Sequence, residues 1–150
     1  MYLPNQGSFK YNILKFALIL GFCGWGISFL FTVTSWSYST GILYGMGASE
    51  IVYQPLLDYW LKMASAVFGA LGIVFLLPLF NMKKYEVLLP ILGFISLFVG
   101  IVLIISSCNN SLDSDIHITF IPDIIFCFVT SSCIFYSITS NKPLKTESQE

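Results

Sequence analysis

Five ionisable side chains lie close to the ends of long apolar segments, where they could form a polar site. The candidate ligand-binding residues are Glu50, Asp58, Lys62, His117 and Asp123. Asp58 precedes Lys62 by four residues, so a helix places both side chains on one face, with the acid on the side that the helix dipole prefers. Such a group could bind a lipid headgroup or a small molecule, and its carboxylates and imidazole could bind a divalent cation.

The same residues also have a purely structural interpretation. Asp58 and Lys62 would form a surface ion pair, Asp123 would cap the start of an apolar helix, and His117 would be solvated. Their spacing matches no known metal signature, so we predict neither a metal nor a cofactor.

The other reactive residue types give no indication of catalysis. The four cysteines, Cys23, Cys108, Cys127 and Cys133, contain no Cys-x-x-Cys pair, which is the usual arrangement of an activated redox thiol. A nucleophilic triad is equally unsupported, because there is one histidine and no Gly-x-Ser-x-Gly elbow. We therefore predict a non-enzymatic protein without catalytic residues.

The composition indicates which kind of chain positions the five side chains. The 150 residues are 56% hydrophobic and only 10% charged, whereas soluble domains carry about 25% charged residues. This excludes an ordinary water-soluble domain. The net charge of −1 gives no basic excess with which to bind nucleic acid.

Four apolar segments are long enough to cross a bilayer, which requires roughly 20 residues of helix. They predict one transmembrane domain over residues 1–150, with spans at about 12–34, 59–80, 86–107 and 121–140. The joint between the second and third spans is so short that these two should form an antiparallel hairpin. The first segment is longer than the apolar core of a signal peptide and precedes no clean cleavage site, so we expect it to be retained as a helix.

The lysines predict the orientation, because cytoplasmic loops accumulate positive charge. In a four-span chain one side of the membrane receives six of them: Lys10, Lys15, Lys83, Lys84, Lys142 and Lys145. Lys62 is the exception. The sequence thus predicts an all-α integral membrane protein, a four-transmembrane-helix antiparallel bundle with both termini cytoplasmic, in the inner (plasma) membrane.

Small residues recur every three or four positions in each span, a spacing that lets membrane helices approach closely. The stripes are Ala17, Gly21, Gly24 and Ser28; Ser65, Gly69 and Gly72; Gly93, Ser96 and Gly100; and Thr130, Cys133 and Ser137. They predict packing surfaces inside the bundle, or an interface between copies of the chain.

The connection after the first span is long, and we expect a short interfacial helix at residues 45–53. Aromatic side chains at this end should form a belt at the membrane surface: Trp36, Tyr53, Tyr59 and Trp60.

The central part of the chain resembles the BphX-like group of small four-helix bacterial membrane proteins. The resemblance covers at most the second to fourth spans and rests on Tyr59, Trp60, Leu61, Lys62, Met63 and Ala64, then Phe68, Gly69, Ala70, Leu71 and Gly72, then Lys83, Lys84 and Tyr85, and finally Gly93 and Gly100. It implies a four-helix membrane fold and no particular activity, because none is assigned to that group.

The expected function is a non-enzymatic accessory or interaction module whose partners are the lipid bilayer, a membrane protein or a second copy of the chain. The alternative is a protein that binds or transports a small molecule or lipid, with its polar site at the extracytoplasmic helix ends.

Overall fold

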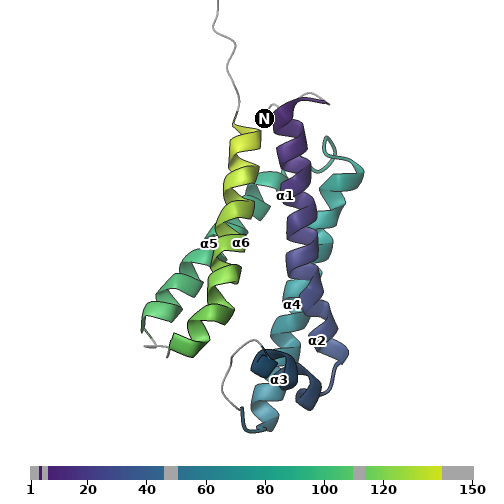
Figure 1. The fold of residues 1–150 in the computed structure, drawn as a ribbon. Helices are drawn as coiled ribbons and strands as arrows, with labels where there is room; N and C mark the ends of the chain where they lie inside the picture. Colours follow the sequence, from purple (N-terminus) through teal and green to yellow (C-terminus); the bar gives the residue numbers. More distant parts are fainter. Residues whose placement is uncertain (1–3, 5–6, 46–50, 110–113, 140–150) are drawn as a thin grey trace, which may run out of the picture.

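The computed structural model of the chain describes residue 4 and residues 7–45, 51–109 and 114–139, with the backbone alone for residues 109 and 114–120. Throughout these residues the chain forms helices and connections and contains no strand (Figure 1). The elements are α1 (Phe9–Gly26), the 3-10 helix η1 (Ile27–Phe29), α2 (Leu30–Val33), α3 (Trp36–Gly45), α4 (Pro55–Phe80), α5 (Leu88–Asn109) and α6 (Ser114–Ile138).

Four stretches of this structure are long and apolar enough to cross a membrane. They are Phe9–Val33, Pro55–Phe80, Leu88–Cys108 and Ile121–Ile138. The four predicted spans are therefore confirmed as helices of suitable length and composition.

Local sequence signals explain where two of these helices begin. Ser8 caps α1, because its hydroxyl accepts a hydrogen bond from the Tyr11 backbone N–H at 3.2 Å. Pro55 begins α4, where a residue without a backbone N–H costs no helical hydrogen bond. The preceding Gln54 is extended, which is the conformation that a following proline favours.

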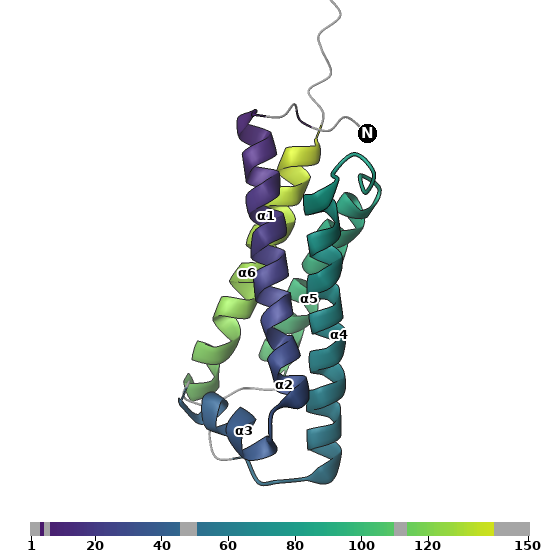
Figure 2. The same ribbon diagram turned by 90° about the vertical axis from the view of Figure 1, so that its right-hand side faces the viewer.

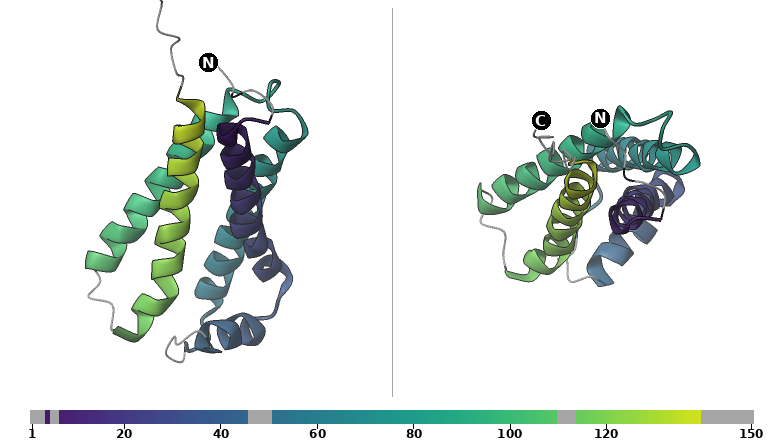
Figure 3. Two further views of the ribbon diagram at one scale, coloured as in Figure 1. Left: turned by 45° about the horizontal axis from the view of Figure 1, so that its top comes forward. Right: turned by 90° about the horizontal axis from the view of Figure 1, so that it is seen from above.

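The helices pack in the order α4, α1, α6, α5. α1 contacts both α4 and α6, and α5 packs mainly on α6, whereas α4 and α5 contact each other sparsely. Viewed from above, α6 lies between α5 and α1 (Figure 3, right). The expected hairpin of the second and third spans is thus not a main packing unit, although only residues 81–87 separate their helices.

The start of α1, the end of α6 and the joint between α4 and α5 lie at one end of the molecule, and α3 lies at the other (Figures 1 and 2). At the first end the Lys10 Nζ donates a hydrogen bond to the Thr139 carbonyl oxygen over 3.2 Å. The α5 and α6 helices diverge from α1 and α4 toward the end of the molecule at which α3 lies (Figure 1).

Most of the small-residue stripes are confirmed as packing surfaces. Ala17, Gly21, Ser65, Gly69 and Gly72 are buried, as are Gly93, Ser96, Gly100, Thr130 and Ser137, while Gly24, Ser28 and Cys133 are half-buried. In five cases a glycine receives a phenylalanine ring from a neighbouring helix: Gly21 faces Phe75, Gly24 faces Phe126, Gly69 faces Phe29, Gly93 faces Phe135 and Gly100 faces Phe128.

The backbones of α1 and α4 approach each other closely at Gly72. A Cβ atom on Gly72 would lie 2.5 Å from the backbone nitrogen and 2.7 Å from the Cα of Gly26. Next to this contact the indole ring of Trp25 packs on Phe68 of α4 and Phe126 of α6, with ring centroids 5.2 Å and 5.5 Å away. Trp25 therefore joins three helices at one level of the bundle.

Candidate functional site

Asp58 and Lys62 form the expected ion pair on the first turns of α4. Their Oδ2 and Nζ atoms are 2.8 Å apart, and the side chains are 19% and 40% exposed respectively. The second carboxylate oxygen of Asp58, Oδ1, is buried and has no hydrogen-bond partner. Lys62, the one lysine that departs from the predicted charge distribution, is thus neutralised by a residue of its own helix.

The rest of the predicted polar site is not assembled by the described residues. Glu50 lies outside them. His117 lies in the first part of α6, where the structure describes the backbone alone. No group of three or more metal-binding side chains gathers in the described part of the chain.

Asp123 lies within α6, so the prediction that it caps the fourth helix is wrong. α6 begins at Ser114 and continues through Pro122. The predicted third and fourth spans left residues 108–120 as a connection, but helix extends into this range on both sides of residues 110–113. Asp123 is exposed and belongs to the candidate span Ile121–Ile138.

The four cysteines are free thiols. Cys23 and Cys108 are exposed, Cys127 is buried and Cys133 is half-buried.

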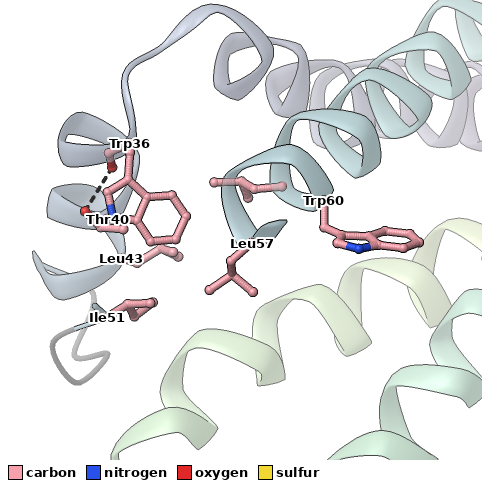
Figure 4. Close-up of a pocket in the computed structure, with 7 residues that line it drawn as sticks. Trp36, Thr40, Leu43, Ile51, Leu57 and Trp60 are labelled. Atoms are coloured by element: carbon pink, nitrogen blue, oxygen red, sulfur yellow. Dashed lines mark hydrogen bonds between the residues drawn. The ribbon is translucent and has the colours of Figure 1, made fainter. Parts of the chain in front are cut away.

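A cavity between α3 and α4 was not predicted from the sequence. It has a volume of about 270 Å³ and an apolar wall, formed by Trp36, Thr40, Leu43, Ile51, Leu57, Trp60 and Leu61 (Figure 4). The hydroxyl of its one polar side chain, Thr40, donates a hydrogen bond to the Trp36 carbonyl oxygen at 2.9 Å. The wall therefore favours an apolar ligand.

The helix that forms one side of this cavity also differs from the prediction. A short helix occupies residues Trp36–Gly45. Of the predicted range 45–53, residues 51–53 are not helical and residues 46–50 lie outside the described residues. Tryptophan at positions 36 and 60 was the available signal for the cavity, but it predicted only a surface belt. The belt interpretation agrees with the strong exposure of Tyr53, Tyr59 and Trp60.

No protein-family model, curated protein or solved structure matches this chain.

Proposed function

We propose that the chain is a multi-pass plasma-membrane protein whose four spans form an antiparallel bundle with both termini in the cytoplasm. The lysine distribution supports this orientation, because Lys10, Lys83 and Lys84 belong to the end of the molecule that contains the start of α1 and the joint between α4 and α5 (Figure 1). The hydrogen bond from Lys10 to the end of α6 is consistent with both termini being on one side.

This orientation predicts which thiols a membrane-impermeant maleimide reaches in intact cells. Cys108 lies near the C-terminal end of α5, and Lys83 lies in the joint that precedes α5. Both residues are exposed. In a chain whose other cysteines are replaced by alanine, Cys108 should react at once. In a Lys83→Cys variant that also lacks Cys108, labelling should require permeabilised cells. Equal labelling of both variants in intact cells would contradict the orientation.

For the activity, we propose a non-enzymatic interaction module that binds a bilayer phospholipid. Part of one acyl chain of the lipid would lie between α3 and α4. The observation that carries this proposal is the apolar cavity of about 270 Å³. Its volume is just below the roughly 300–1,000 Å³ of typical small-molecule pockets, which suits a segment of a chain better than a whole drug-sized ligand.

The position of the cavity supports the same ligand. Leu57, Trp60 and Leu61 come from the first turns of a candidate span. Tryptophan prefers the boundary between headgroups and acyl chains. A cavity lined by Trp36 and Trp60 would therefore lie next to lipid acyl chains. The Asp58–Lys62 pair on the same turns provides charges of both signs for the headgroup.

Filling the cavity should reduce lipid binding. In native mass spectra of the purified protein with added palmitoyl-oleoyl phosphatidylglycerol, Leu57→Trp should weaken lipid retention about tenfold, or about 1.4 kcal/mol. Leu56→Trp is the matched control, because Leu56 is 66% exposed and does not line the cavity. If Leu57→Trp retains lipid as well as Leu56→Trp does, the cavity is not the lipid site.

The second candidate function is binding or transport of a small molecule or lipid through the polar residues expected from the sequence, Glu50, Asp58, Lys62, His117 and Asp123. The buried, unpartnered Oδ1 of Asp58 favours it, because a buried carboxylate oxygen normally has a donor. In the same mass spectra, loss of ligand in Lys62→Ala with full retention in Leu57→Trp would favour the polar site. A co-purified protein would favour a membrane-protein partner, and a dimer mass a second copy of the chain.

A further inference from the structure

The ion pair of Asp58 and Lys62 lies directly beside the wall of the apolar cavity between α3 and α4 (Figure 4). Leu57 and Leu61 belong to that wall, and each is followed in the sequence by one member of the pair. The leucines and the charged residues therefore share the same levels of α4, turned by about 100° around the helix axis. A molecule with an apolar part in the cavity can place a polar end against the pair.

The net charge of this region favours one class of polar end. Residues 36–45 and 51–57, which form α3 and lead into α4, contain no ionisable acid, base or histidine. The Lys62 Nζ and the Asp58 Oδ2 are 2.8 Å apart, so the pair is neutral as a whole. An anionic headgroup would find no free positive charge here. A zwitterionic headgroup, in contrast, provides a counter-charge for each member of the pair.

The order of the two charges along α4 matches the order of charges in a zwitterionic phospholipid. Asp58 is in the first turn of α4, and Lys62 lies about 6 Å further into the candidate span. In such a lipid the phosphate is next to the glycerol and the acyl chains, and the ammonium group lies beyond it. Lys62 is 40% exposed and has N–H groups that it does not use on Asp58, so it can donate to the phosphate. The lipid ammonium then lies closer to Asp58.

The carboxylate of Asp58 distinguishes between an ammonium group with N–H donors and one without them. Its Oδ2 accepts a hydrogen bond from Lys62, but its Oδ1 is buried and has no donor among the described residues. A buried acceptor is normally paired, and a carboxylate forms its strong hydrogen bonds with charged N–H groups. Because the terminal torsion of an aspartate is broad and the side chain is 19% exposed, either oxygen can turn toward a headgroup. An ethanolamine ammonium provides N–H donors, whereas the trimethylammonium of choline provides none.

We propose that the Asp58–Lys62 pair selects phosphatidylethanolamine as the lipid that occupies the cavity between α3 and α4. This inference rests on the proposed binding of an acyl chain there, and it adds the headgroup that the protein prefers. The Asp58 carboxylate accepts hydrogen bonds from the lipid ammonium, and the Lys62 ammonium donates to the lipid phosphate. Every charge then has an opposite charge beside it, and the unpaired carboxylate oxygen gains a donor.

Stepwise methylation of the lipid tests this selection without altering the protein. Palmitoyl-oleoyl phosphatidylethanolamine and its N-methyl, N,N-dimethyl and trimethyl (choline) forms carry the same charges, but only the choline form lacks an N–H donor. In native mass spectra with each lipid at the same concentration, retention should fall about tenfold at the final methyl group, the loss of one charged hydrogen bond. Equal retention of the four lipids, or an equal decrease at every methyl group, overturns the proposal.

Asp58→Asn should change the preference among lipids. The amide keeps the shape of the side chain but leaves Lys62 as an unpaired cation. The advantage of the ethanolamine over the choline lipid should disappear, and retention of palmitoyl-oleoyl phosphatidylglycerol relative to the ethanolamine lipid should rise about tenfold. Loss of folding alone would lower the retention of all lipids together. The unaltered preference in Asp58→Asn overturns the proposal.

Glu86→Gln is the matched control for the change in charge. It also removes one carboxylate, but in the joint between α4 and α5, at the end of the molecule opposite α3 (Figure 1). This variant should keep the preference of the unaltered protein. If Glu86→Gln shifts the preference as much as Asp58→Asn does, the effect comes from net charge, and the headgroup site is refuted.

Leu57→Trp separates a failure of this inference from a failure of the proposed function. If it lowers the retention of every lipid while the unaltered protein shows no preference for ethanolamine, the acyl-chain cavity stands and the headgroup selection is wrong. If it lowers the retention of no lipid, the cavity is not occupied, and both proposals are wrong.

Discussion

Gly72→Ala is expected to destabilise the bundle more than any other single-methyl addition. The added Cβ would lie 2.5 Å from the backbone nitrogen of Gly26. A side chain in that place could rotate away, but a helix backbone cannot, so α1 and α4 would have to separate. Overpacking of this kind costs about 1–3 kcal/mol and sometimes more, and we expect the upper end of that range. The measurement is the midpoint of thermal unfolding in a mild detergent, followed by size-exclusion elution.

Gly41→Ala is the matched control for this prediction. Gly41 also lies within a helix, α3, but a Cβ there would meet nothing within 4 Å. Alanine favours helix over glycine by about 1 kcal/mol, so this variant should be at least as stable as the unaltered protein. If the two variants unfold at the same temperature, the close approach of Gly72 to Gly26 is wrong.

Trp25→Ala should have an effect of similar size for the opposite reason, the loss of packing. Trp25 is 7% exposed and contacts rings from α4 and α6. Membrane helices associate through van der Waals packing and not through burial from water, so an empty space between them forfeits attraction directly. Large-to-small changes of buried aromatic residues cost about 3–5 kcal/mol. We expect loss of the compact elution peak at temperatures at which the unaltered protein remains folded.

Trp60→Ala removes the same side chain from an exposed position. Trp60 is 53% exposed and lies at the start of α4. Its replacement should change the unfolding free energy by less than about 1 kcal/mol. Equal losses of stability for the two tryptophan variants would show that Trp25 does not join the helices.

The features that the sequence predicted correctly depend on local spacing. The four spans follow from bilayer thickness, which requires long uncharged helices. The Asp58–Lys62 pair follows from the helical repeat, because residues four apart lie side by side on a helix. Burial of Gly69, Gly72 and Gly93 follows from the same repeat applied to small residues.

The features that it missed depend on neighbours that are distant in sequence. Pro122 and Asp123 together are typical of a helix start, but α6 continues through both. A proline inside a membrane helix is tolerated where neighbouring groups pair with the freed backbone carbonyl. No local pattern could show that α1 packs between α4 and α6, or that α3 and α4 enclose a cavity.

The candidate site changed for the same reason. From the sequence we expected the fourth helix to begin near Asp123, and we therefore grouped Asp123 with the residues of the extracytoplasmic surface. With α6 beginning at Ser114, the carboxylate lies within a helix and belongs to a candidate span.

The 3-10 helix η1 changes the direction in which side chains of the first span point around the helix axis. A 3-10 helix advances about 120° per residue where an α-helix advances about 100°. Its three residues, Ile27–Phe29, therefore turn everything that follows by about 60° relative to α1. α1 contacts both α4 and α6, but η1 and α2 contact chiefly α4. The extra rotation thus turns the last part of the first span toward α4, beyond the segment that packs on α6.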